Sequence, residues 1–200
     1  TMIHGNIDLK DLFLLNKKIT FLNHGSFGSC PTPIFEEFQQ YQTLLETQPI
    51  AFLDEHIGKN ILSAQQALSR FINCNEDDIV FFTNPTTAIN EVMRCIPLRA
   101  GDEILSSTHE YGALDKAWDF ICKKRSSVHV KALIPNPIPS KAAFIDSFVS
   151  AITSRTKVIF ISHITSITGL IFPVKEIIKI AQEKNIITII DGAHVPGHIP

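Results

Sequence analysis

The stretch from Ile186 to Gly197, which reads IITIIDGAHVPG, constrains the fold of this chain more than any other. It begins with five apolar or β-branched residues and then reaches Asp191. Such a run predicts a strand covered on both faces, as in a parallel sheet flanked by helices. Ligands of these sheets bind just beyond the carboxyl ends of the strands. Asp191 is therefore predicted to place a carboxylate where this architecture binds its ligands.

Short apolar runs alternate with segments of helical periodicity from residue 79 onward. The predicted strands are 79–82, a turn and strand across 101–107, 128–134, 157–162 and 186–190. The predicted helices between them are 87–95, 112–124, 140–152 and 173–184. This alternation predicts an α/β fold, with a mostly parallel sheet and helices on both of its faces.

The N-terminal part of the chain lacks this alternation. Its pattern predicts a short helix at 8–15, a loop at 21–33, helices at 33–46 and 57–72, and an irregular link, TQPIAFLDEHI, between those two helices. We therefore expect an N-terminal arm and helix over residues 1–56 and the α/β domain over residues 57–200.

The composition excludes several classes of protein. The chain is 44% hydrophobic, 19% charged and carries a net charge of −2, which predicts a folded core and no binding to nucleic acid or to an anionic membrane. No apolar stretch approaches the length of a membrane span, and the first residues do not read as a signal peptide. The four cysteines are far apart, which indicates reduced thiols in a cytoplasmic protein.

Polar clusters follow the predicted strands. In TNPTTAIN (83–90), Thr86 and Thr87 stand near the start of a helix, where free N–H groups and the helix dipole favour an anion such as phosphate. Helix capping by a threonine is the alternative interpretation. In SHITSITG (162–169), hydroxyl side chains such as Ser166 could surround a ligand or simply form a turn, and His163 alone is more typical of a structural histidine.

The segment THEYGALDKAW (108–118) places an aromatic ring just past a strand. Tyr111 could stack on a planar ligand, although a tyrosine at such a junction is more often packed with its hydroxyl bonded. His109 is open to the same two interpretations. Trp118 is expected in the core.

A metal site receives little support. His194 and His198 are four residues apart, but Pro196 and Gly197 between them disfavour the regular helix that this spacing needs. A metal-dependent hydrolase that uses both histidines and Asp191 is therefore the less favoured alternative. The sequence has no GxGxxG after a strand, no GxxxxGK[ST] and no GxSxG, so nicotinamide binding, P-loop chemistry and an α/β-hydrolase lose their main support.

An anion site, an aromatic ring, a ring of hydroxyls and a buried carboxylate together suit a flat, phosphorylated heterocycle with a basic nitrogen. Pyridoxal 5′-phosphate has these properties. A carboxylate beside the pyridine nitrogen keeps that nitrogen protonated, and the protonated ring accepts electrons from the α-carbon of a substrate.

With these residues in view, the sequence resembles the class V aminotransferases, which are fold type I enzymes dependent on pyridoxal phosphate, and most of all their isopenicillin N epimerase-like branch. The matching pieces occur in the family's order: FLNHGSFGSCP (21–31), TNPTTAIN (83–90), GDEIL and HEYGALDKAWDF within 101–120, SRTKVIFISHITSITGLIFPV (154–174) and IIDGAHVPG (189–197). The resemblance implies the large domain of this fold. It also implies chemistry at the α-carbon of an amino acid, as an epimerase, a transaminase or a C–S lyase.

The resemblance implies roles at the cofactor. Thr86 and Thr87 match the positions that hold the phosphate, and Tyr111 matches the residue whose ring stacks on the cofactor. Asp191 matches the carboxylate that pairs with the pyridine nitrogen.

Other matched positions lie around the reacting atoms. His194 and Ser166 match positions that face the phenolic oxygen of the cofactor, so Asp191 and His194 are the candidate catalytic residues. A loop that lines the substrate pocket in the family is matched by Asn23, His24 and Ser26.

The family holds its cofactor as a Schiff base on a lysine downstream of the aspartate, a position that falls after residue 200. Lys175, Lys179 and Lys184 are expected on the surface. We therefore expect the N-terminal part of a longer enzyme, with an incomplete large domain and no activity by itself. A non-catalytic protein that keeps the fold without this lysine is the alternative. By the same resemblance, the full-length protein is expected to form a homodimer.

Overall fold

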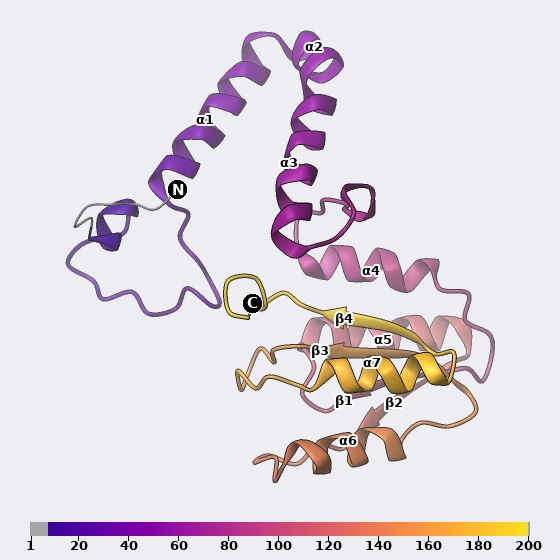
Figure 1. The fold of residues 1–200 in the computed structure, drawn as a ribbon. Helices are drawn as coiled ribbons and strands as arrows, with labels where there is room; N and C mark the ends of the chain where they lie inside the picture. The colour runs from indigo at the N-terminus through magenta and orange to yellow at the C-terminus, as the bar shows by residue number, and fades with distance from the viewer. Residues whose placement is uncertain (1–7, 200) are drawn as a thin grey trace. The chain divides into compact units, whose positions relative to one another are not determined.

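The computed structural model describes residues 8–199, which divide into two compact units between Phe81 and Phe82. Residues 8–81 are mainly helical, and residues 82–199 contain the sheet (Figure 1). The predicted boundary between residues 56 and 57 falls inside a continuous helical stretch. The assignment of domains stays a prediction.

The helical unit contains η1 (Leu9–Leu12), α1 (Thr32–Thr47), α2 (Pro49–Ala51), the π-helical turn η2 (Phe52–His56), α3 (Ile57–Ile72) and η3 (Glu76–Asp78). The irregular link predicted between the two long helices is wrong. Only Gln48 interrupts the helices, and Pro49 then opens α2 because its fixed φ suits the first turn of a helix. α2, η2 and α3 follow one another directly.

No strand forms at residues 79–82, so this prediction is also wrong. Ile79 is extended, but its N–H donates back to the Glu76 carbonyl and its own carbonyl accepts from Gln65 Nε2 at 2.8 Å. Val80 is 72% exposed. An apolar sequence becomes a strand only where a neighbouring strand completes its hydrogen bonds, and no described segment does so here.

The α/β unit follows the predicted alternation. Its elements are α4 (Pro85–Cys95), β1 (Glu103–Ser107), α5 (Gly112–Arg125), β2 (Val128–Ala132), α6 (Lys141–Ser150), β3 (Thr156–Ser162), α7 (Val174–Glu183) and β4 (Ile187–Asp191). All strands are parallel, in the order β2-β1-β3-β4. None of the helices in the described residues has the length and apolar character that a bilayer crossing requires.

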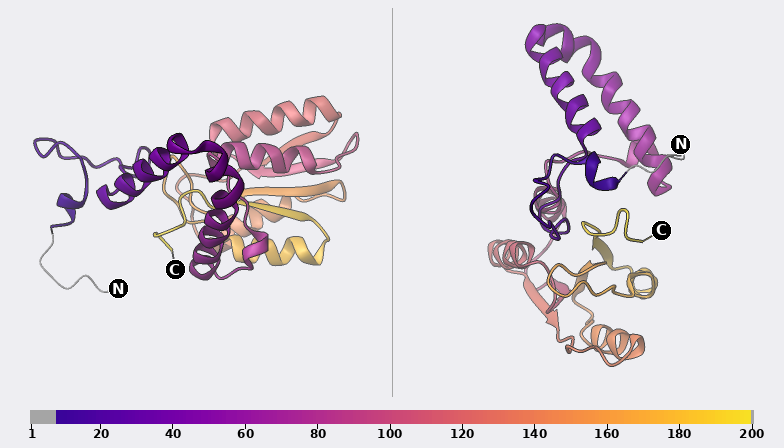
Figure 2. Two further views of the ribbon diagram at one scale, coloured as in Figure 1. Left: turned by 90° about the horizontal axis from the view of Figure 1, so that it is seen from above. Right: turned by 90° about the vertical axis from the view of Figure 1, so that its left-hand side faces the viewer.

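Two separate cores cover the two faces of the sheet. Figure 2 shows the helices that lie on both of these faces. On one face, Leu105, Ile159 and Ile161 pack against α6 and α7. On the other face, the neighbouring residues Ile104, Val158 and Phe160 pack against α4 and α5. This alternation explains why β3 is apolar at successive positions: each face of the strand is buried under helices.

The start of α4 lies at the edge of the sheet where the strands end. Arg125, the last residue of α5, donates to the carbonyls of Arg94 and Ile96 at the end of α4, so these helices finish together. Because α5 starts just after β1 ends, α4 also starts at the carboxyl edge of the strands (Figure 1). The predicted phosphate-binding turn and Asp191 therefore share one edge of the unit.

Candidate functional site

Asp191 ends β4 and is 8% exposed. Its Oδ1 accepts a hydrogen bond from Ala193 N at 3.0 Å, and its backbone carbonyl accepts one from His163 N at 2.9 Å. Oδ2 has no hydrogen bond to any described residue. It is not one of the fully buried polar atoms that lack a partner. The carboxylate is thus held by one oxygen and offers the other, which is the arrangement expected of a ligand-binding group.

The helix start predicted to bind phosphate is capped by Asn84, not by a threonine. Asn84 Oδ1 accepts from Thr87 N at 2.8 Å, and Pro85 occupies the first turn, so α4 begins two residues before the predicted position. The hydroxyls of Thr86 and Thr87 form no hydrogen bonds within the described residues. Both hydroxyls therefore remain available as donors at the positive end of the helix dipole.

Tyr111 lies directly before α5 and is 45% exposed. Its hydroxyl has no hydrogen bond among the described residues, so the ring is not packed in the way that the alternative interpretation required. His109 differs, because its Nε2 lies 3.0 Å from the Ile134 carbonyl and its ring contacts Phe172 edge-on. Trp118 is fully buried, as predicted.

In the loop after β3, some hydroxyl groups form hydrogen bonds within a turn and one does not. Thr165 closes a tight turn: its Oγ1 accepts from Leu170 N and lies 2.7 Å from Thr168 Oγ1. Ser166 is exposed and its side chain is not bonded within the described part of the chain. The turn interpretation therefore holds for the threonines, whereas Ser166 remains available to a ligand.

Partial burial, with a smaller contribution from the charge of Lys175, lowers the pKa of His163 below its ordinary value.

His194 is half-buried in the loop after β4. Its ring forms no hydrogen bond with any described residue. His198 turns its Nδ1 back to the His194 carbonyl at 2.6 Å. Across residues 8–199, no three metal-ligating side chains are placed to hold an ion together.

The predicted substrate-binding loop belongs to the other unit. Asn23 accepts backbone hydrogen bonds from Ser26 and Phe27 through its carbonyl, and the His24 ring contacts Phe21 edge-on. These contacts fold the loop locally. The assignment of Asn23, His24 and Ser26 to a substrate pocket stays a prediction.

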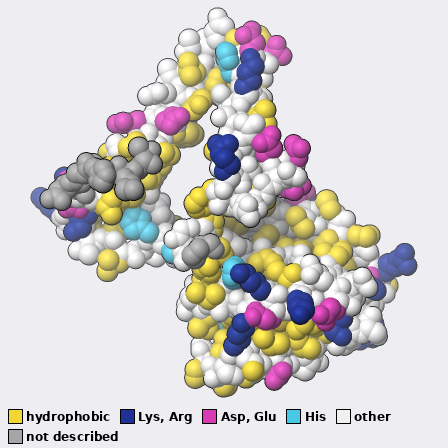
Figure 3. Space-filling model, in the orientation of Figure 1, with side chains coloured by type: hydrophobic (Ala, Val, Ile, Leu, Met, Phe, Trp, Pro, Cys, Tyr) yellow, Lys and Arg dark blue, Asp and Glu magenta, His cyan; other side chains and the backbone are white. Residues whose placement is uncertain are grey.

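The lysines of α7 and its end lie on the surface, as predicted. Lys175, Lys179 and Lys184 are exposed. Figure 3 shows basic and acidic side chains interspersed over the face of the α/β unit where α7 lies.

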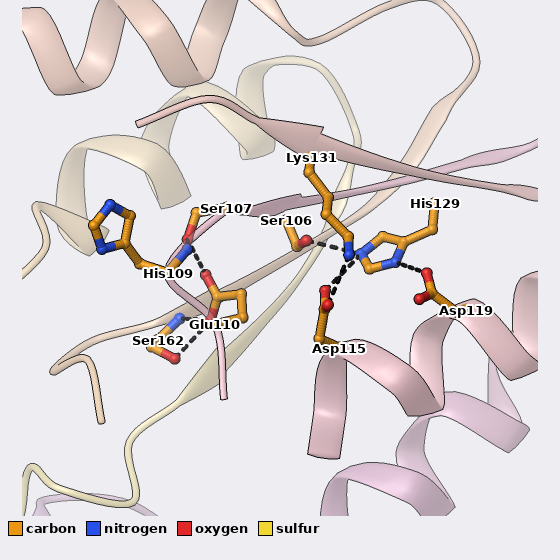
Figure 4. Close-up of polar contacts among 9 residues, drawn as sticks. All are labelled: Ser106, Ser107, His109, Glu110, Asp115, Asp119, His129, Lys131 and Ser162. Atoms are coloured by element: carbon orange, nitrogen blue, oxygen red, sulfur yellow. Dashed lines mark hydrogen bonds and ion pairs between the residues drawn. The ribbon is translucent and has the colours of Figure 1, made fainter. Parts of the chain in front are cut away.

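Sequence reasoning missed two polar groupings (Figure 4). In the first, Glu110 accepts hydrogen bonds from Ser107 and Ser162. In the second, His129 lies between Ser106 Oγ, at 2.8 Å, and Asp119 Oδ1, at 2.7 Å. Serines at the ends of predicted strands were the available signal for the first grouping. The second joins residues far apart in sequence and had no comparable signal.

Comparisons with known proteins identify the family of this chain. The sequence model of the class V aminotransferases matches residues 28–200. Isopenicillin N epimerase of Streptomyces clavuligerus is 33% identical over 93% of this chain and 47% of its own length. L-cysteine desulfhydrase of Arabidopsis thaliana is 25% identical over 89% of this chain and 42% of its own length. The chain thus spans about half the length of these relatives.

Solved structures show the same fold. A mutant of C-DES with glycine covalently linked to its pyridoxal phosphate cofactor superposes with a TM-score of 0.82 at 23% identity, over 90% of this chain and 48% of that one. The cysteine desulfurase CsdA of Escherichia coli gives a TM-score of 0.80 at 20% identity, over 96% and 49%. The predicted fold class is confirmed. The chain belongs to the class V aminotransferases, a family of pyridoxal-phosphate-dependent enzymes.

Proposed function

We propose that this chain is the cofactor-binding part of a pyridoxal-phosphate-dependent enzyme that acts at the α-carbon of an amino acid. The observation that carries the proposal is Asp191, a buried carboxylate at the end of β4 that leaves Oδ2 without a partner among the described residues. A carboxylate in this position suits a basic ring nitrogen, because each charge favours the other at hydrogen-bonding distance.

The other end of the cofactor also fits the residues present. The unbonded hydroxyls of Thr86 and Thr87 stand in the first turn of α4, at the same edge of the sheet as Asp191. Hydroxyl donors and a helix N-terminus suit the 5′-phosphate. The exposed ring of Tyr111, at the start of α5, would cover one face of the pyridine.

Pyridoxal phosphate supplies a protonated ring that accepts the electrons left on the α-carbon when a bond to that carbon breaks. Asp191 would hold the proton on the ring nitrogen. His194 and Ser166, whose side chains are not engaged with other described residues, would face the phenolic oxygen. The covalent lysine is expected after residue 200.

The relatives support two outcomes of this chemistry. One is named for epimerisation of isopenicillin N and another for removal of sulfide from L-cysteine. Both names describe changes at or next to the α-carbon of an amino acid. We propose an amino-acid-like substrate, with epimerase, transaminase or C–S lyase chemistry as the candidates.

We also propose that the full-length protein is a cytoplasmic homodimer. The dimer is inferred from the family resemblance. The four cysteines are free, three of them exposed, which agrees with a reducing compartment. Light scattering of the native protein tests the dimer, and cell fractionation tests the compartment.

The cofactor assignment is tested by titrating the native protein with pyridoxal 5′-phosphate and with pyridoxal, followed by visible absorption. Loss of one charge-assisted hydrogen bond costs about 1.5–3 kcal/mol, or roughly 10- to 100-fold in affinity. We expect Asp191→Asn to weaken binding of both compounds to that extent. Thr86→Ala combined with Thr87→Ala should weaken only the phosphorylated compound.

Asp146→Asn is the matched control, because Asp146 is an exposed carboxylate on α6. It should leave both affinities unchanged. Equal binding of pyridoxal and pyridoxal phosphate by the unaltered protein would contradict the phosphate site. An absence of binding would contradict the proposed function.

A further inference from the structure

Glu110 connects the ends of two neighbouring strands. Its Oε1 accepts from Ser107 Oγ at 2.5 Å, and its Oε2 accepts from Ser162 N at 2.8 Å and Ser162 Oγ at 2.6 Å (Figure 4). Ser107 is the last residue of β1, and Ser162 is the last residue of β3. The carboxyl group is therefore shared between two strand ends.

This connection replaces backbone pairing that has stopped. The register between β1 and β3 ends at the pair Leu105 and Ile159, before either strand ends. Beyond that pair, Glu110 bonds the backbone N–H of Ser162 in the role that a strand carbonyl would otherwise take. Without Glu110, this buried N–H would lose its acceptor.

The environment of Glu110 is unusual for a carboxyl group. The residue is 7% exposed, and no basic side chain pairs with it in the part of the chain that the structure describes. Burial raises the pKa of its carboxyl group, whereas the hydrogen bonds from Ser107 and Ser162 oppose that rise. A buried carboxyl is tolerated only when directed donors satisfy it, as they do here.

The atoms that Glu110 holds lead directly to the candidate site. Ser162 pairs in register with Asp191, and the next amide, His163 N–H, donates to the Asp191 carbonyl at 2.9 Å. On its own segment, Glu110 is followed immediately by Tyr111. Glu110 thus fixes the backbone beside the carboxylate proposed to bind the ring nitrogen and beside the aromatic ring proposed to cover the pyridine.

We propose that Glu110 is a positioning residue, which acts through Ser162 and its own peptide bond to set the geometry of Asp191 and Tyr111 around the pyridine ring. The inference rests on the proposed cofactor. It predicts that Glu110 governs the ring end of the site and not the phosphate end, because none of its hydrogen bonds to described residues reaches α4.

The test compares Glu110→Ala and Glu110→Gln in the native protein. Glutamine offers a carbonyl to both Ser162 donors and an amide to Ser107, so it should largely restore the unaltered behaviour. Alanine removes every acceptor. We expect Glu110→Ala to weaken pyridoxal binding about tenfold, which corresponds to one hydrogen bond, to reduce the visible circular dichroism of bound cofactor, and to leave the affinity for inorganic phosphate unchanged.

A second readout needs no cofactor. In the apoprotein, hydrogen exchange of a peptide covering 160–165 should accelerate in Glu110→Ala and return toward the original rate in Glu110→Gln. Ile121→Ala controls for general destabilisation, because Ile121 is buried in the second half of α5, away from the strand ends. It should leave the dichroism of bound cofactor and the exchange of this peptide unchanged.

The outcomes separate the two proposals. If the unaltered protein fails to bind pyridoxal phosphate, the proposed function is wrong. The role of Glu110 is tested separately in the apoprotein, and it is wrong if peptide 160–165 exchanges hydrogen at the same rate in Glu110→Ala as in the unaltered chain. If the unaltered protein binds but Glu110→Ala and Ile121→Ala behave alike, Glu110 has no positioning role. Should Glu110→Ala not fold, Ser162→Ala removes one of the bonds to Glu110 and must reduce the dichroism of bound cofactor more than Ile121→Ala does, or the inference fails.

Discussion

Glu103 at the start of β1 allows a quantitative test of how the sheet is anchored. Its side chain is 3% exposed, and Oε1 accepts from Arg155 Nε at 2.8 Å and Nη2 at 2.5 Å, while Oε2 accepts from Thr153 Oγ1 at 2.5 Å. These bonds connect β1 to the turn that precedes β3. Glu103→Gln keeps the shape of the side chain and removes its charge.

The expected loss follows from these contacts. A hydrogen bond to a charged group contributes about 1.5–3 kcal/mol and a neutral one about 1 kcal/mol, so the two bonds from Arg155 would lose about 1–4 kcal/mol together. Arg155 is 67% exposed, which screens its charge and favours the lower half of that range. We expect Glu103→Gln to lower the free energy of unfolding by about 1–2 kcal/mol at neutral pH.

The pH dependence gives an independent check. The hydroxyl of Thr153, together with Arg155, holds the pKa of Glu103 below its ordinary value of 4.5. A lowered pKa in the folded state stabilises the protein fully above the unfolded pKa, and this stability is lost as the pH falls through the folded pKa. The difference between the unaltered chain and Glu103→Gln should therefore be constant above about pH 5.5 and shrink below about pH 4.5.

Urea unfolding followed by the fluorescence of Trp118, the single tryptophan of the sequence, measures this difference. Glu91→Gln is the control, because Glu91 is exposed on α4 and has no ion pair among the described residues. Equal stability of Glu103→Gln and the unaltered chain at pH 7 would refute the reasoning. A difference that persisted undiminished at pH 3 would refute it too.

Three further predictions concern packing, the buried histidine and a turn. Phe148→Ala should destabilise the α/β unit by about 3–5 kcal/mol in urea unfolding, because Phe148 is fully buried under the sheet; a loss below about 1 kcal/mol would contradict close packing there. His129→Leu should lower the free energy of unfolding by about 1–3 kcal/mol, because it leaves Ser106 and Asp119 without their partner. Asp119→Asn should lower it less, since the His129 ring keeps its hydrogen bond with Ser106. The reverse order would be inconsistent with this network. Gly169→Ala should lower the free energy of unfolding by about 1–2 kcal/mol, and with it Tm, because Gly169 has φ +63°. The space around Gly169 is open, so only backbone strain opposes the added methyl group. An unchanged Tm would show that the turn relaxes.

The sequence predicted those features that depend on local pattern. The run IITII predicted β4 with Asp191 at its end, and Ile190 and Ile189 do pack against the two opposite cores. The predicted coverage of both faces is incomplete, because β4 is an outer strand whose Ile187 is 49% exposed. The strand predicted at 79–82 has an equally apolar sequence. Its failure shows that a strand also needs a neighbour, which the pattern of one segment does not contain.

The candidate site divides in the same way. Tyr111 could be proposed from its position at a strand–helix junction, and the two threonines of α4 from their place at the start of a helix. The cap at Asn84 was misjudged, because asparagine and threonine have similar capping propensities and only the backbone geometry decides between them. The contact of Glu110 with Ser162 could not have been predicted from either segment, since the two residues are 52 positions apart and the contact lies beyond the point where the pairing of β1 and β3 stops.

The two outer strands of the sheet differ in how well they resist further strand pairing. β2 carries Lys131, which is ion-paired with Asp115, and a charge on an edge strand opposes the addition of another strand. β4 reads ITIID, and its Ile187 is 49% exposed. Its outer backbone groups have no partner strand among residues 8–199. In solution, the 200-residue chain should consequently aggregate through β4 as its concentration rises.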